Sequence, residues 1–166
     1  MQTAYFSGGC FWCIEAIFQR VNGVQNLTSG YCNGSTKNPT YQEICEGRSG
    51  HAEVLKIEFE ETQISYAELL EVFFVVHDPT SLNRQGGDTG VQYRSAVFYT
   101  DTDQREIAQS LIDSIKGAVT EISPLDIFYV AEDYHQNYFN DNQNQPYCQM
   151  VILPKINKYL NNDLNI

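Results

Sequence analysis

The stretch GGCFWC, residues 8–13, separates two segments with different hydrophobic patterns. Residues 3–7 have the length and composition of a short β-strand, which the two glycines end. Beyond the stretch, apolar residues recur at the spacing of one helix face: Ile14, Ile17, Phe18 and Val21. The sequence therefore predicts a strand, a tight glycine turn, and a helix that begins near Cys10 and ends before Gly23.

Cys10 opens this predicted helix. Unpaired amide groups and the positive end of the helix dipole stabilise an anion there, so we expect the Cys10 thiol to have a lowered pKa. Cys13 lies three residues on, which places both side chains on the same side of the first turn. A disulfide between them would require that turn to loosen, because disulfide geometry is narrow. Phe11 and Trp12 are expected either to line a small apolar pocket beside the thiol or to belong to the core.

The chain contains five cysteines: Cys10, Cys13, Cys32, Cys45 and Cys148. An odd number argues against a secreted disulfide framework. A thioredoxin-like site would need a βαβ pattern around the Cys-x-x-Cys, which the following chain does not fit. A zinc site would need a second close pair of ligands, whereas Cys32 and Cys45 are 13 residues apart. Simple burial suits the three later cysteines. A peroxide- or sulfoxide-reducing cysteine fits best, since it becomes a sulfenic acid and then a disulfide with a nearby thiol.

The remaining hydrophobic pattern mixes strands and helices without strict alternation, which is typical of an α+β fold. We expect a single domain, residues 1–166, built as a two-layer sandwich of a mixed or antiparallel sheet with packed helices. The expected strands are residues 24–31, 54–59, 95–100, 119–122 and 127–130, and the expected helices are residues 65–76, 103–115 and 150–160. Two long polar loops, residues 32–50 and 78–92, are expected to carry functional residues.

Composition narrows the function classes. The formal net charge of -11, without any cluster of Lys or Arg, argues against a nucleic-acid partner. The longest apolar run, residues 72–76, is far too short to span a membrane. Residues 1–7 lack the basic and apolar regions of a secretory signal, so we expect a cytoplasmic location.

The motifs together resemble one family, the peptide methionine sulfoxide reductases of the A type. Seven segments follow the family's order, which is far more specific than any one of them. They are residues 9–12 (GCFW), 30–31 (GY), 38–41 (NPTY), 50–53 (GHAE), 77–79 (HDP), 86–95 (from GGD to QYRS) and 131–136 (AEDYHQ).

The resemblance implies a catalytic role for four residues. Cys10 would attack the sulfoxide sulfur, and Glu53 would protonate the sulfoxide oxygen with help from the hydroxyls of Tyr41 and Tyr93. The chemistry calls for such an acid, because a sulfoxide oxygen is a poor leaving group until it is protonated. An apolar pocket around Glu53 would raise its pKa by desolvation.

The resemblance also implies how substrate is held and how the enzyme is recycled. Phe11 and Trp12 would hold the methyl group, and Asp88 would order the site and bind the substrate backbone. The substrate would be methionine-S-sulfoxide, free or in proteins, and thioredoxin or a glutaredoxin-like protein would reduce the resulting disulfide. No metal or organic cofactor is expected. Two alternatives remain: a general thiol-disulfide oxidoreductase and a non-catalytic zinc-binding module.

The chain departs from the family pattern at two places. Asn33-Gly34 replaces a pair of glycines, and asparagine tolerates the positive φ that this turn requires. Cys13 stands where many members have glycine and resolve through a cysteine near the C-terminus. Both Cys13 and Cys148 are available here, and we favour Cys13 as the resolving thiol with Cys148 as the alternative.

Overall fold

The computed structural model describes residues 1–161 and contains one six-stranded sheet in the order β7-β6-β1-β3-β2-β8. Its strands are β1 (Gln2–Ser7), β2 (Val24–Cys32), β3 (Ala52–Phe59), β6 (Ala96–Tyr99), β7 (Glu121–Pro124) and β8 (Tyr129–Val130). Neighbouring strands are antiparallel except β6 and β7, which are parallel. The predicted α+β class with a mixed sheet is confirmed.

Helices and turns connect these strands. The helices are α1 (Phe11–Phe18), α2 (Tyr41–Cys45), α3 (Tyr66–Val76), α4 (Thr102–Asp113), α5 (Tyr138–Asp141) and α6 (Leu153–Asn161). The shorter elements are a hairpin of β4 (Arg84–Gln85) and β5 (Asp88–Thr89), the 3₁₀ turns η1 (Val91–Tyr93) and η2 (Asp133–His135), and the π-helical turn η3 (Cys148–Ile152), which continues into α6. Along the part of the chain that is described, no helix is long and apolar enough to cross a membrane.

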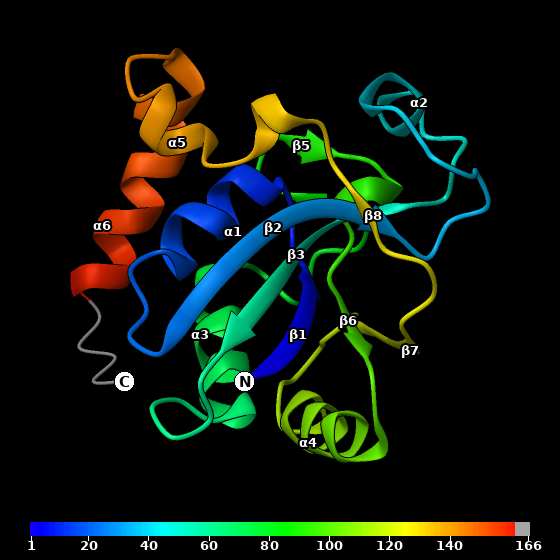
Figure 1. Ribbon diagram of the computed structural model, residues 1–166, viewed down its shortest axis with the longest axis vertical. Helices are drawn as coiled ribbons and strands as arrows, with labels where there is room; N and C mark the ends of the chain where they lie inside the picture. Colours follow the sequence, from blue (N-terminus) through cyan, green and yellow to red (C-terminus); the bar gives the residue numbers. More distant parts are fainter. Residues whose placement is uncertain (162–166) are drawn as a thin grey trace.

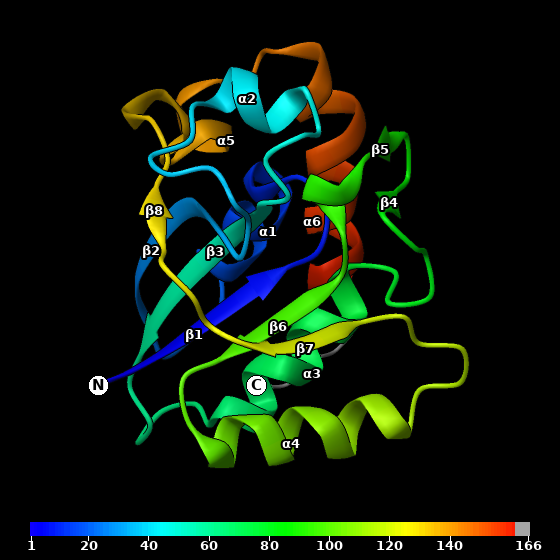
Figure 2. The same ribbon diagram turned by 90° about the vertical axis from the view of Figure 1, so that its right-hand side faces the viewer.

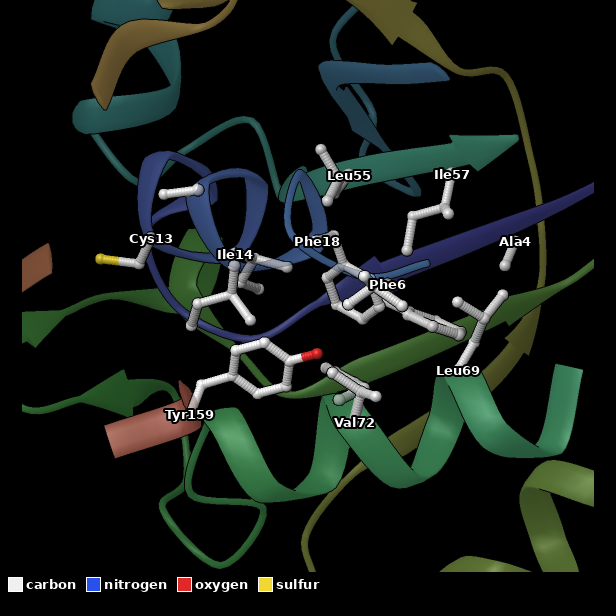
Figure 3. Packing of buried hydrophobic residues seen from close by; sticks show 14 of the residues in the cluster. Ala4, Phe6, Cys13, Ile14, Phe18, Leu55, Ile57, Leu69, Val72 and Tyr159 are labelled. Atoms are coloured by element: carbon white, nitrogen blue, oxygen red, sulfur yellow. The ribbon is translucent and has the colours of Figure 1, made fainter. Parts of the chain in front are cut away.

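Side chains alternate between the two faces of the sheet, as pleated strands require. On β1, Ala4 and Phe6 face the helices α1, α3 and α6, and their side chains meet those of the helices in one cluster (Figure 3). Tyr5 faces the other side, where the segment around Leu125 and Phe128 covers the sheet. The sheet is therefore buried on both faces, and most of the core lies on the helix side.

Strand register brings distant residues to one end of the sheet. Phe6 of β1 pairs with Leu55 of the antiparallel β3, so the chain beyond β1 turns beside the beginning of β3, where Glu53 lies. Glu53 is two residues from Leu55 and so points to the same face, toward α1. The elements α2, β5 and α5 lie at this end, and α4 lies at the opposite end (Figure 1; Figure 2).

The long-loop prediction was incomplete. Residues 32–50 contain the short helix α2, whose N-terminus is closed by a capping box in which Thr40 and Glu43 bond each other's backbone amides. Residues 78–92 contain the β4–β5 hairpin and η1. The predicted strand at residues 119–122 lies two residues later, as β7, and the last helical segment begins at Cys148 rather than at residue 150.

Candidate active site

The glycine turn after β1 fixes the position of Cys10. Gly9 has a φ of 90°, and a Cβ atom there would lie 2.8 Å from the Gln85 side chain, so a larger residue would clash as well as strain the backbone. The Gly9 amide donates a hydrogen bond to the Tyr93 carbonyl at 3.2 Å. Cys10 then adopts an extended conformation as the N-cap of α1. The predicted strand, glycine turn and helix-opening cysteine are confirmed.

The two thiols of the motif are buried and interact with each other. Cys10 is 7% exposed and Cys13 is 2% exposed, and each thiol affects the pKa of the other. Burial raises the pKa of Cys10 well above its ordinary value, whereas the neighbouring Cys10 side chain lowers the pKa of Cys13 to about 7. The expectation that Cys10 has a lowered pKa in the free protein is therefore wrong, because desolvation outweighs the N-terminus of a two-turn helix.

Cys13 belongs to a hydrogen-bonded chain that reaches Asp88. The Tyr147 hydroxyl donates to Asp88 Oδ2 at 2.7 Å, and it lies 3.5 Å from Cys13 Sγ. Since its proton is used on Asp88, the Tyr147 oxygen is left to accept from the Cys13 thiol. Figure 3 shows the Cys13 sulfur at the edge of the apolar cluster, pointing away from its centre. Asp88, which was predicted to order the site, is thus linked to Cys13 through the Tyr147 hydroxyl.

Glu53 is a buried carboxyl group with an unpartnered oxygen. It is 2% exposed, and among the described residues its Oε2 atom has no hydrogen-bond partner. Burial raises its pKa well above 4.5, and the negative charges of Asp88 and Cys13 raise it further. Burial thus raises the Glu53 pKa, as the sequence predicted, which favours the protonated form that a general acid must have.

Tyr41 and Tyr93 reach Glu53 from two different elements. Tyr41 is the first residue of α2, and Tyr93 ends η1 beside the glycine turn. Burial raises the pKa of both phenols, and the charge of Glu53 contributes to each rise. Both side chains are therefore neutral hydroxyl groups near Glu53, able to donate hydrogen bonds to a substrate oxygen.

Arg94 holds these elements in place. Its guanidinium donates to the carbonyls of Gly50 and Val91, each at 3.0 Å, and pairs with Glu121 at 2.8 Å. Gly50 lies just before β3, and Val91 opens η1. One partly buried cation therefore joins the segment that carries Tyr93 to the segment that leads into Glu53.

The two aromatic residues of the motif differ in environment. Phe11 is fully buried against Tyr31. Trp12 is half-buried, and its indole N–H donates to His135 Nδ1 at 3.0 Å while its ring stacks on Tyr138 at 3.7 Å. Of the two rings, Trp12 alone has an exposed part that a substrate can contact.

The contacts of Tyr138, Tyr147 and His135 did not follow from the sequence. Tyr147 contacts residues 59 and 134 positions away, and His135 bonds Trp12 across 123 positions. No local pattern encodes such contacts. The one sequence feature that pointed to Tyr147 was its position directly before Cys148.

The other cysteines occupy different surroundings. Cys148 is buried near Cys13 at the start of η3. Cys32 belongs to the cluster on the far face of the sheet, and Cys45 is exposed at the end of α2. Within residues 1–161, no three His, Cys, Asp or Glu side chains gather as a metal site would require.

Comparison with known proteins identifies the family to which the chain belongs. The family model of peptide methionine sulfoxide reductase matches residues 2–165. The chain belongs to the peptide methionine sulfoxide reductase family. It is 59% identical over 162 residues to peptide methionine sulfoxide reductase MsrA of Ruthia magnifica, covering 97% of this chain and 99% of that one. It is 62% identical over 160 residues to MsrA of Vesicomyosocius okutanii, covering 96% and 98%.

Solved structures agree with the family membership. Methionine sulfoxide reductase A of Corynebacterium diphtheriae superposes with a TM-score of 0.78 at 36% identity, covering 86% of this chain and 75% of that one. Mxr1 of Saccharomyces cerevisiae in its reduced form superposes with a TM-score of 0.80 at 31% identity, covering 89% and 88%. Mxr1 in complex with Trx2, at 22% identity and a TM-score of 0.56, shares the fold and covers 82% and 84%. The predicted activity, reduction of methionine sulfoxide, is confirmed by the family.

Proposed function

We propose that the chain reduces methionine-S-sulfoxide, free or in proteins, with Cys10 as the nucleophile and Glu53 as the general acid. The observation that carries this assignment is the pairing of a helix-opening thiol with a buried carboxyl group of raised pKa and two neutral phenols at one end of the sheet. A sulfoxide needs a sulfur nucleophile and a proton for its oxygen, and these residues supply both.

In the first step, the Cys10 sulfur attacks the sulfoxide sulfur while Glu53 donates its proton to the oxygen. Tyr41 and Tyr93 hold that oxygen by hydrogen bonds as it gains the proton. The oxygen passes to Cys10, which becomes a sulfenic acid, and methionine leaves. The Cys10 thiol proton restores Glu53, so Cys10 is oxidised by two electrons and the sulfoxide is reduced by two.

In the second step, the thiol of Cys13 attacks the sulfenic sulfur of Cys10. A disulfide forms, and the departing hydroxyl takes the Cys13 proton to form water. The position of Cys13 in the first turn of α1, which Cys10 caps, and the Cys13 pKa of about 7 support Cys13 as the resolving residue. Cys148, buried beside Cys13, is the alternative.

In the third step, a dithiol protein such as thioredoxin reduces the disulfide by thiol–disulfide exchange. The yeast relative Mxr1, which has been captured in complex with Trx2, supports this partner. A glutaredoxin-like protein could perform the same exchange. We also propose a cytoplasmic location, where such dithiol proteins keep the five cysteines reduced.

The nucleophile is tested by the Cys10→Ser variant. We expect it to lose reduction of methionine-S-sulfoxide completely, with an unchanged circular dichroism spectrum. Cys32→Ser, which removes a thiol on the far face of the sheet, is the control and should keep its activity. Turnover in Cys10→Ser at the wild-type rate would overturn the proposal.

A further inference from the structure

Glu15 is a second buried carboxyl group, and the reaction above does not use it. It lies one turn after Trp12 on α1 and is only 3% exposed. A carboxyl group is rarely buried unless the structure gives it specific partners. Its Oε1 atom accepts the backbone N–H of Asn137 at 2.9 Å.

The turn that Glu15 binds carries both partners of Trp12. His135, two residues before Asn137, accepts the indole N–H, and Tyr138, one residue after it, stacks on the indole ring. Asn137 itself has a φ of 55°, a left-handed conformation that is uncommon outside glycine and needs support from its surroundings. Figure 1 shows α5, which begins at Tyr138, beside α1.

The same turn is also tied to the sheet. The Gln136 side chain accepts the Ser29 amide at 2.8 Å and donates to the carbonyls of Ser29 and Ala131. These bonds set the distance of the turn from β2 but do not contact α1. Phe11 of α1 also packs on the His135 ring, but Glu15 is the buried α1 side chain that bonds the backbone of the turn.

We propose that Glu15 is a positioning residue for the substrate methyl site, holding the 135–138 turn so that His135 and Tyr138 fix the Trp12 indole. Trp12 and Glu15 are three residues apart, so both lie on the same side of α1 and bind the same turn at two points. The inference rests on the proposed function in one respect, the contact of Trp12 with substrate.

The chain offers a direct readout of this role, because Trp12 is its only tryptophan. Indole fluorescence and the near-ultraviolet circular dichroism of the free protein therefore report on Trp12 without any substrate. Replacing Glu15 by alanine should shift the emission to the red and weaken the indole dichroism, since the ring loses its stacking partner. Failure of the proposed reaction would leave this spectral result standing, so the two failures are distinguishable.

Kinetics give the second readout. We expect Glu15→Ala to raise the KM for a peptide methionine sulfoxide about tenfold and to change kcat less than about threefold, well within the roughly 100-fold that misplacing a binding group can cost. Glu15→Gln should behave like the wild type, because its amide oxygen can still accept the Asn137 amide. A polar cavity of about 320 Å³ beside Glu15 and Gln19 leaves room for water on the new amide group.

Gln19→Ala is the matched control. Gln19 lies one turn further along α1 and bonds the Asn137 and Asn140 side chains at 2.8 and 3.1 Å, but it is exposed and does not bind the turn's backbone. We expect its KM and indole emission to match the wild type. An effect as large as that of Glu15→Ala would show that any loosening of the segment suffices, and would overturn the specific role of Glu15.

A double-mutant cycle with Trp12→Phe separates positioning from a general loss of structure. If Glu15 acts through Trp12, adding Glu15→Ala to Trp12→Phe should raise KM less than about twofold. A further tenfold rise there would overturn the proposal, and so would unchanged emission and KM in Glu15→Ala or equal damage in Glu15→Gln. If Glu15→Ala does not fold, Glu15→Asp, which withdraws the carboxylate by one methylene, decides by the same criteria.

Discussion

Glu53 and Glu15 are buried to nearly the same extent, at 2% and 3% exposure, but they have different partners. One oxygen of Glu53 has no partner among the described residues, and the charges of Asp88 and Cys13 add to the effect of burial. Burial also raises the pKa of Glu15, but hydrogen bonding to the backbone of the 135–138 turn opposes that rise. Burial alone therefore does not decide what a carboxyl group can do.

This difference in partners distinguishes a carboxyl group that can donate a proton from one that holds a turn in place. A carboxyl group that nothing stabilises as an anion keeps its proton and can give it to a substrate. A carboxylate that accepts backbone amides holds those amides in place. Glu53 lies near the beginning of β3, at the end of the sheet where Cys10 lies. Glu15 lies on the side of α1 that faces the turn carrying the partners of Trp12. Their positions therefore agree with these two roles.

The largest expected difference between the two glutamates is in the chemical step. Glu53→Gln should slow sulfoxide reduction by about 10²- to 10⁴-fold, because a general acid contributes that much. Glu15→Gln should leave the step close to the wild-type rate. Single-turnover release of methionine measures both. A loss of less than about tenfold in Glu53→Gln would remove Glu53 from the role of acid.

The pH dependence of the chemical step should differ in the same way. Because the Glu53 pKa is raised, the protonated acid persists to a higher pH than an ordinary carboxyl group would allow, and the rate should fall as pH rises through that raised pKa. Glu53→Gln cannot lose a proton there, so its low residual rate should not show this fall. Single-turnover rates measured across a pH series in both proteins test this, and an identical alkaline limb in Glu53→Gln would contradict it.

Stability should separate the two residues in a second way. The folded protein keeps the Glu53 proton to a higher pH than the unfolded chain, whose glutamate has its ordinary pKa of 4.5. Between these pKa values the folded state binds more protons, so stability falls as pH rises through this window. Glu53→Gln avoids that loss, and we expect its free energy of unfolding to exceed that of the wild type at pH 7 but not at pH 4.

Urea unfolding at the two pH values measures this effect. Glu15→Gln serves as the comparison, because backbone amides already stabilise the Glu15 carboxylate and the gain at pH 7 should be smaller. An equal gain in both variants, or none in Glu53→Gln, would show that the two carboxyl groups are not held differently.

The smallest expected effect concerns the turn that Glu15 holds. Asn137→Ala should destabilise the fold by at most about 1–2 kcal/mol, because alanine adopts the left-handed conformation less readily than asparagine. Asn137→Gly keeps the backbone amide and accepts the positive φ, so it should cost less than alanine. Equal unfolding free energies for the two variants would show that the turn is not strained.

The sequence correctly predicted those features of the site that a single local physical rule decides. The strand, glycine turn and helix around Cys10 follow from pattern, and Asn33 does adopt the left-handed φ, 57°, that its replacement of glycine required. The raised pKa of Glu53 also followed, because an apolar setting has one physical consequence. The roles of Glu53, Tyr41 and Tyr93 came from the family resemblance and remain predictions.

The features of the fold and the site that the sequence did not predict depend mainly on burial and on contacts between residues far apart in the chain. The Cys10 pKa was predicted in the wrong direction, because the sequence shows a helix terminus but not how deeply the thiol is buried. Tyr147 joins Asp88 to Cys13 only after the C-terminal segment has folded back over α1. Helix α2 was missed although its capping box is visible in the sequence, because polar residues outweighed that signal.

The central claim, that Cys10 takes the oxygen and Cys13 resolves the product, is tested most directly by one turnover without reductant. The protein is mixed with one equivalent of methionine-S-sulfoxide, trapped with an alkylating agent, and its disulfide is mapped by mass spectrometry in the wild type, Cys13→Ser and Cys148→Ser. We expect one methionine released and a Cys10–Cys13 disulfide in the wild type and Cys148→Ser, with slowed thioredoxin recycling in Cys13→Ser. A disulfide that lacks Cys10, or full-rate recycling of Cys13→Ser, would contradict it.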